Sequence, residues 1–81
     1  MQRVLVVDDS PSVRQQVGLA LKPMGYQIVE AVDGVDGVEK IKSDSSVGMV
    51  ICDVNMPRMS GLELVETVKK DPRFANLPIV M

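Results

Sequence analysis

The sequence predicts an α/β protein built on a parallel sheet, and two observations carry that prediction. Strand patterns alternate with amphipathic helix patterns through the whole chain, in the order β-α-β-α-β-α-β. Such alternation implies parallel strands joined by right-handed helical crossovers. Two of the strand patterns, residues 4–7 and 49–52, are unbroken apolar runs, which are typical of strands buried on both faces. Each of these two runs ends abruptly in aspartate.

Length and composition limit the classes of protein to be considered. The chain has 81 residues, of which 46% are hydrophobic and 25% charged, as in one ordinary globular domain. A net charge of −2 offers no basic surface for nucleic acid, and no apolar run approaches the ~18 residues of a membrane span. One cysteine and no histidine exclude a disulfide framework and a Cys/His zinc site. We therefore expect a cytoplasmic protein without nucleic-acid or membrane binding.

The first unit is a strand over residues 3–7, an acidic loop and a helix. Asp8 and Asp9 follow the strand, and Ser10 with Pro11 forms a helix start, with serine at the N-cap and proline at the first helical position. Apolar residues at the spacing i, i+4, i+7, i+8 predict one buried helix face, made by Val13, Val17, Ala20 and Leu21. Pro23 ends this helix.

The second and third units repeat the plan. Residues 27–31 form a short strand, and Asp33-Gly34 begins a helix with one apolar side, made by Val35, Val38 and Ile41. The third strand ends at Cys52, whose thiol we expect to be buried and inert. After the loop, Ser60 and Glu63 form a capping box for a helix with the apolar face Leu64, Val65 and Val68. Residues 79–81 begin a fourth strand.

Three carboxylates are the candidate functional groups. If the first and third strands are neighbours, Asp8, Asp9 and Asp53 converge at the carboxyl edge of the sheet, where open α/β sheets bind ligands. Carboxylates so close repel one another unless a cation is present. Mg²⁺ prefers such oxygen ligands, and Mn²⁺ accepts the same ligand type. An aspartate beside the metal suits a nucleophile toward a phosphoryl group. In the alternative reading the acids only cap a helix and end a strand in water.

Three segments together resemble the receiver domain of two-component response regulators, which is CheY-like. They are Val-Val-Asp-Asp-Ser at 6–10, Asp-Gly at 33–34 and Asp-Val-Asn-Met-Pro-Arg-Met-Ser-Gly at 53–61. The resemblance implies that residues 1–81 are the N-terminal two-thirds of such a domain. It also implies a flavodoxin-like, three-layer αβα sheet with strand order 2-1-3-4-5, incomplete here because the family's final strands and helices are missing.

The resemblance further implies the site and its partners. Asp53 would be the phosphoacceptor, forming an aspartyl phosphate. Asp9 would bind Mg²⁺ directly, Asp8 mainly through water, and the backbone carbonyl of Asn55 would be a further ligand. The phosphodonor would be a phosphohistidine on a histidine kinase or a phosphotransfer protein. The chain would then be a signalling protein and not an enzyme, with an output domain or effector that the sequence does not specify.

Two other functions fit parts of the pattern. A receiver-like module could bind partners without phosphorylation. A phosphotransferase of the haloacid-dehalogenase type also uses an aspartate nucleophile, but it needs a second aspartate two positions on, where Asn55 stands. Arg58 near the site is either a contact for phosphate or kinase, or a solvated loop charge.

The length of the chain leads to a further expectation. A strand over residues 79–81 would be an apolar sheet edge that invites pairing with another chain. We expect the sequence to be a fragment of a longer chain. The alternatives are a homodimer formed by swapping or edge pairing, or a half-domain made as such.

Overall fold

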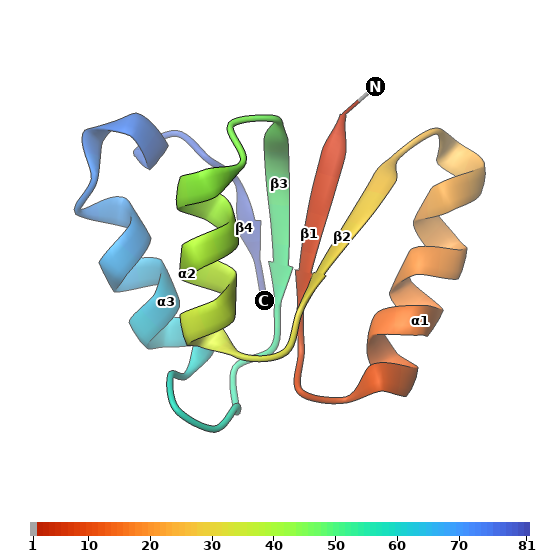
Figure 1. Ribbon diagram of the computed structural model, residues 1–81, viewed down its shortest axis with the longest axis horizontal. Coiled ribbons are helices and arrows are strands. Elements are labelled where there is room, and N and C mark those ends of the chain that lie inside the picture. Colours follow the sequence, from red (N-terminus) through yellow and green to blue (C-terminus); the bar gives the residue numbers. More distant parts are fainter. Residues whose placement is uncertain (1) are drawn as a thin grey trace.

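A computed structural model describes residues 2–81, so Met1 of the predicted domain lies outside the described residues. One sheet contains four parallel strands in the spatial order β2-β1-β3-β4 (Figure 1). The strands are β1 (Arg3–Val7), β2 (Gln27–Ala31), β3 (Val47–Cys52) and β4 (Ile79–Val80). This order matches the first four positions of the flavodoxin-like order, and the predicted parallel α/β fold is confirmed.

The helices lie on both faces of the sheet. They are α1 (Pro11–Leu21), α2 (Gly34–Ser43) and α3 (Gly61–Lys69), with short 3₁₀ turns η1 (Lys22–Met24) and η2 (Pro72–Phe74). Helices α2 and α3 pack side by side on one face, and α1 covers the other (Figure 1). Side-chain caps fix where each helix begins, because the side chains of Ser10, Asp33 and Ser60 accept backbone N–H bonds at the three N-termini. The capping box between Ser60 and Glu63 is present.

The hydrophobic core lies between the sheet and the pair α2 and α3. Side chains alternate across a strand, so Leu5 and Val7 of β1 face this core while Val4 and Val6 face α1. All four of these side chains are buried. The predicted inner faces of α2 and α3 are confirmed at the buried positions, which are Val38, Ile41, Leu64 and Val68.

The predicted inner face of α1 is only partly right, because Val17 and Leu21 are half-buried but the other two predicted residues are not. Val13 is 38% exposed and Ala20 is also exposed, and Gly18 is the one fully buried residue of this helix. The helix approaches β2 along Gly18, where an added Cβ would lie 3.8 Å from the side chain of Ile28. Arg14, on the same side of the helix one turn earlier, keeps only 12% of its side chain exposed. A polar residue therefore occupies the inner face, and apolar periodicity cannot detect it.

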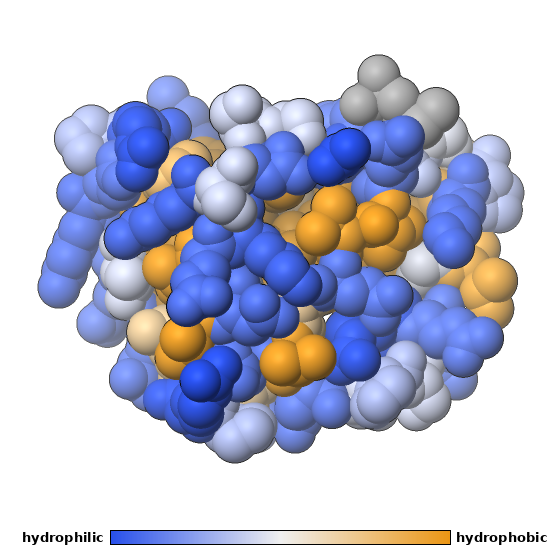
Figure 2. Space-filling view, in the orientation of Figure 1, coloured by the Kyte–Doolittle hydropathy of each residue, from blue (hydrophilic) through white to orange (hydrophobic). Residues whose placement is uncertain are grey.

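The prediction that β3 is buried on both faces is also only half right. Val50 and Cys52 are buried against α2 and α3, whereas Met49 and Ile51, on the face of α1, are half-buried. At the β4 edge, Val80 and Met81 are 52% and 53% exposed. The face seen in Figure 2 shows apolar patches separated by hydrophilic side chains.

Candidate functional site

Strand register brings the acidic residues together. Val7 of β1 pairs with Ala31 of β2 and with Cys52 of β3, so these three strands end at the same level of the sheet. The N–H of Asp53 donates to the carbonyl of Val7 at 2.9 Å, and the N–H of Asp8 donates to the carbonyl of Ala31 at 3.1 Å. Asp8 and Asp53 are therefore neighbours across two central strands, at the carboxyl edge of the sheet.

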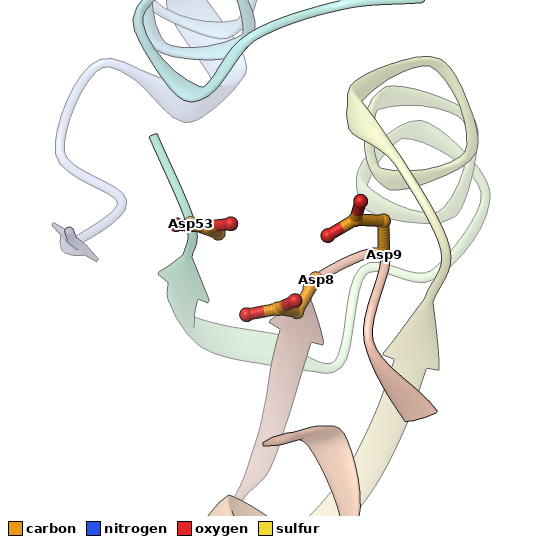
Figure 3. Close-up of side chains that lie close together, drawn as sticks. All are labelled: Asp8, Asp9 and Asp53. Carbon is orange, nitrogen blue, oxygen red and sulfur yellow. The ribbon is translucent and has the colours of Figure 1, made fainter. Parts of the chain in front are cut away.

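The three carboxylates point toward one another (Figure 3). One oxygen from each of Asp8, Asp9 and Asp53 lies within 4.8 Å of the other two. Asp9 is exposed, while Asp8 and Asp53 are half-buried. The sequence thus predicted correctly which three acids meet.

No basic side chain of the protein neutralises this cluster within residues 2–81, because none of the ion pairs there involves Asp8, Asp9 or Asp53. One oxygen of Asp8 accepts the N–H of Ser10 at 2.9 Å, and one oxygen of Asp53 accepts the N–H of Val54 at 2.8 Å. Mg²⁺ holds its oxygen ligands at about 2.0–2.1 Å, so opposite ligands lie about 4 Å apart. The acid cluster therefore fits a hard divalent cation in donor type, and an ion bound directly to all three acids would draw their oxygens closer together than 4.8 Å.

Behind the acids, the loop from Asp53 to Ser60 is closed by a tight contact. The N–H of Gly61 donates to the carbonyl of Val54 at 2.9 Å. A Cβ on Gly61 would lie only 2.3 Å from the carbonyl oxygen of Asp53, so this position requires glycine. Asn55 is exposed and lies two residues after Asp53 in this loop, and its part in metal binding stays a prediction.

Two arginines fix the loops of the site through contacts that the sequence did not predict. Arg14 donates to the carbonyl of Asp8 at 2.6 Å and to the carboxylate of Glu30 at 2.8 Å, and so fixes the β1–α1 loop. Arg58 donates two hydrogen bonds to Asp33, so neither sequence interpretation of Arg58 described its actual contact. The two ion pairs, Arg14 with Glu30 and Arg58 with Asp33, join residues 16 and 25 positions apart, and no local pattern marks them.

Cys52 lies just before Asp53 but faces the core, where it is 3% exposed. Burial, followed by the negative charges of Asp53 and Asp8, raises the pKa of its thiol to about 11. The thiol is therefore neutral at physiological pH, and the predicted burial is confirmed.

Comparison with known proteins identifies the family. The family model of the response regulator receiver domain matches residues 4–81. The chain belongs to the response regulator receiver family. This receiver chain is 41% identical over 80 residues to the chemotaxis protein CheY1 of Helicobacter pylori, a match that covers 98% of the chain and 64% of that relative. The chain thus spans slightly less than two-thirds of the length of this relative.

Solved structures agree with the fold of the receiver chain. The chemotaxis response regulator CheY4 of Vibrio cholerae superposes with a TM-score of 0.91 at 39% identity, covering 98% of the chain and 65% of CheY4. The response regulator TrrA of Thermotoga maritima has been crystallised in complex with the histidine kinase ThkA. That structure superposes with a TM-score of 0.87 at 35% identity, covering 98% of the receiver chain and 66% of the matched chain. Another structure of TrrA is a complex with Mg²⁺-BeF. Among the described residues of the receiver chain, no helix has the length and apolarity to span a membrane.

Proposed function

We propose that this chain is a phosphoacceptor in two-component signalling. Asp53 accepts a phosphoryl group from the phosphohistidine of a histidine kinase or phosphotransfer protein, with Mg²⁺ at the acid cluster. The observation that carries the proposal is the meeting of Asp8, Asp9 and Asp53 within 4.8 Å without a basic partner among the described residues. Family membership and the kinase complex of TrrA support the same partner class. A cytoplasmic location and a domain spanning residues 1–81 belong to this proposal.

The residues have separate tasks in this proposal. Asp8, Asp9, Asp53 and the carbonyl of Asn55 would hold the Mg²⁺, which when bound offsets negative charge on the phosphoryl oxygens. A carboxylate oxygen of Asp53 attacks phosphorus, the bond from phosphorus to the histidine nitrogen breaks, and the imidazole leaves with the electron pair. The product is an acyl phosphate on Asp53.

The environment of Asp53 suits this nucleophilic role. The N–H of Val54 holds one carboxylate oxygen at 2.8 Å and so orients the group, while the other oxygen has no protein hydrogen-bond donor within residues 2–81. The haloacid-dehalogenase alternative lacks such support, because an amide at Asn55 cannot act as a general acid or base.

Intact mass spectrometry with acetyl phosphate as donor tests the proposal. We expect the wild-type protein to gain the mass of one phosphoryl group with Mg²⁺ and none with EDTA. Asp53→Asn should gain nothing, whereas the matched control Glu66→Gln, which changes an exposed acid of α3, should behave as wild type. Uptake by Asp53→Asn equal to wild type would overturn the assignment. Steady release of phosphate from a phosphate ester would favour the phosphotransferase.

A further inference from the structure

An ion pair joins the loop that follows Asp53 to the start of helix α2. The guanidinium of Arg58 donates from Nε to one oxygen of Asp33 at 2.7 Å and from a terminal nitrogen to the other at 3.0 Å. Asp33 is the N-cap of α2, accepts the N–H of Asp36 at 2.8 Å, and is only 6% exposed. This two-point geometry fixes the direction of the guanidinium as well as its distance. The Arg58–Asp33 pair is therefore anchored on a rigid helix end.

The backbone of Arg58 is held in an unfavourable conformation. Its φ of 67° is in the left-handed region, and it is the one non-glycine residue there within residues 2–81. A side chain with a Cβ disfavours this region, and such a conformation persists where the surrounding contacts determine it. The Arg58–Asp33 pair is the contact positioned to do so.

Few other bonds hold this part of the loop. Among the described residues, the backbone of residues 55–58 makes no hydrogen bond to a residue outside the loop, and Met59 donates only to the carbonyl of Pro57, at 2.8 Å. The side chains of Met56 and Met59 pack against the core. Gly34 touches Met59 so closely that a Cβ added to Gly34 would lie 2.5 Å from the carbonyl oxygen of Met59. Apolar packing thus seats the loop, while Arg58 supplies its polar attachment to the rest of the fold.

We propose that Arg58 is a positioning residue, whose ion pair with Asp33 holds residues 55–58 so that the carbonyl of Asn55 can reach a metal ion bound at the acid cluster. The inference rests on the proposed function, since it concerns the same metal site. Arg58 itself need touch neither the metal nor the phosphoryl group. Without the pair, the loop carrying Asn55 moves more freely, and Mg²⁺ must order it on binding.

Two variants separate positioning from stability. Arg58→Gly removes the guanidinium but is comfortable at φ 67°, so the fold is retained. Asp33→Asn removes the charge but keeps a good N-cap for α2. Arg73→Gln is the matched control, because Arg73 also pairs with a nearby aspartate, Asp71, away from the acid cluster.

The test combines two measurements on the purified protein. Amide hydrogen exchange without metal should be faster at residues 54–60 in both variants than in wild type. Calorimetric titration with Mg²⁺ should show an affinity about three- to tenfold lower, at or below the ~10–100-fold typical of residues that directly orient metal ligands. The double variant should lose no more Mg²⁺ affinity than either single variant, because both substitutions remove the same interaction. Arg73→Gln should match wild type in both measurements.

The outcomes distinguish this inference from the proposed function. Wild-type exchange and wild-type Mg²⁺ affinity in Arg58→Gly would overturn the positioning role and leave phosphorylation of Asp53 standing. A wild-type protein that binds no Mg²⁺ would overturn both.

Discussion

Replacing Gly61 by alanine tests whether the site depends on a close backbone contact behind Asp53. The new Cβ would lie 2.3 Å from the carbonyl oxygen of Asp53, about 0.7 Å inside the 3.0 Å below which real Cβ contacts essentially never fall. The obstacle is backbone, so the first turn of α3 and the end of β3 must move apart. Such overpacking costs about 2 kcal/mol. In a domain of this size that lowers Tm by roughly 8–16 °C.

The same displacement should impair phosphorylation. A shift of about 1 Å in a reacting group can cost about 100-fold in rate, so we expect phosphorylation of Gly61→Ala from acetyl phosphate to be roughly 30- to 100-fold slower. Gly25→Ala is the matched control, because its φ of 92° makes alanine costly by about 1–2 kcal/mol while nothing lies within 4 Å of the new Cβ. It should lower Tm without slowing phosphorylation. Wild-type Tm and rate in Gly61→Ala would refute the reasoning.

Three further predictions follow from packing and titration. Leu64→Ala, at a fully buried site, should lower the free energy of unfolding in urea by about 2–5 kcal/mol, whereas Leu62→Ala, at a site 57% exposed on the same helix, should change it by less than about 0.5 kcal/mol. Cys52, with its pKa raised to about 11, should react with iodoacetamide at pH 8 far more slowly in the folded protein than in urea, and equal rates would contradict the burial. The hydrogen bonds from Arg58 hold the pKa of Asp33 below its usual 3.8, so the Asp33 carboxylate stabilises the fold above pH 3.8, and this stabilisation is lost as the pH falls through the pKa of the folded state. The difference in unfolding free energy between wild type and Asp33→Asn, measured in urea across pH, should therefore shrink in acid. A difference independent of pH would contradict this assignment.

The sequence was sufficient for the sheet and for the three acids, because both depend on local patterns. Unbroken apolar runs ending in aspartate predicted β1 and β3 and the edge at which Asp8 and Asp53 meet, and strand register then determined their proximity. Capping residues such as Ser60 predicted where helices begin, since the cap bonds form within one turn.

What the sequence could not supply were the contacts between distant loops and the polar residue on the inner side of α1. Arg14 lies on the inner side of α1 because its guanidinium finds Glu30 and the carbonyl of Asp8, and hydropathy assigns a charged residue to the outside. Arg58 and Asp33 are 25 positions apart and pair only because the fold brings two loops together. Side-chain polarity was informative for strands, and misleading where a buried polar group had a partner.

Locating the phosphoryl group on the chain tests the central claim most directly. After reaction with acetyl phosphate and Mg²⁺, borohydride reduction converts a phosphorylated aspartate to homoserine, which peptide mass mapping then places in the sequence. We expect homoserine at position 53 alone, with Asp8 and Asp9 unchanged. Homoserine in place of Asp8 or Asp9, or the absence of any reduced aspartate, would contradict the assignment of Asp53 as the phosphoacceptor.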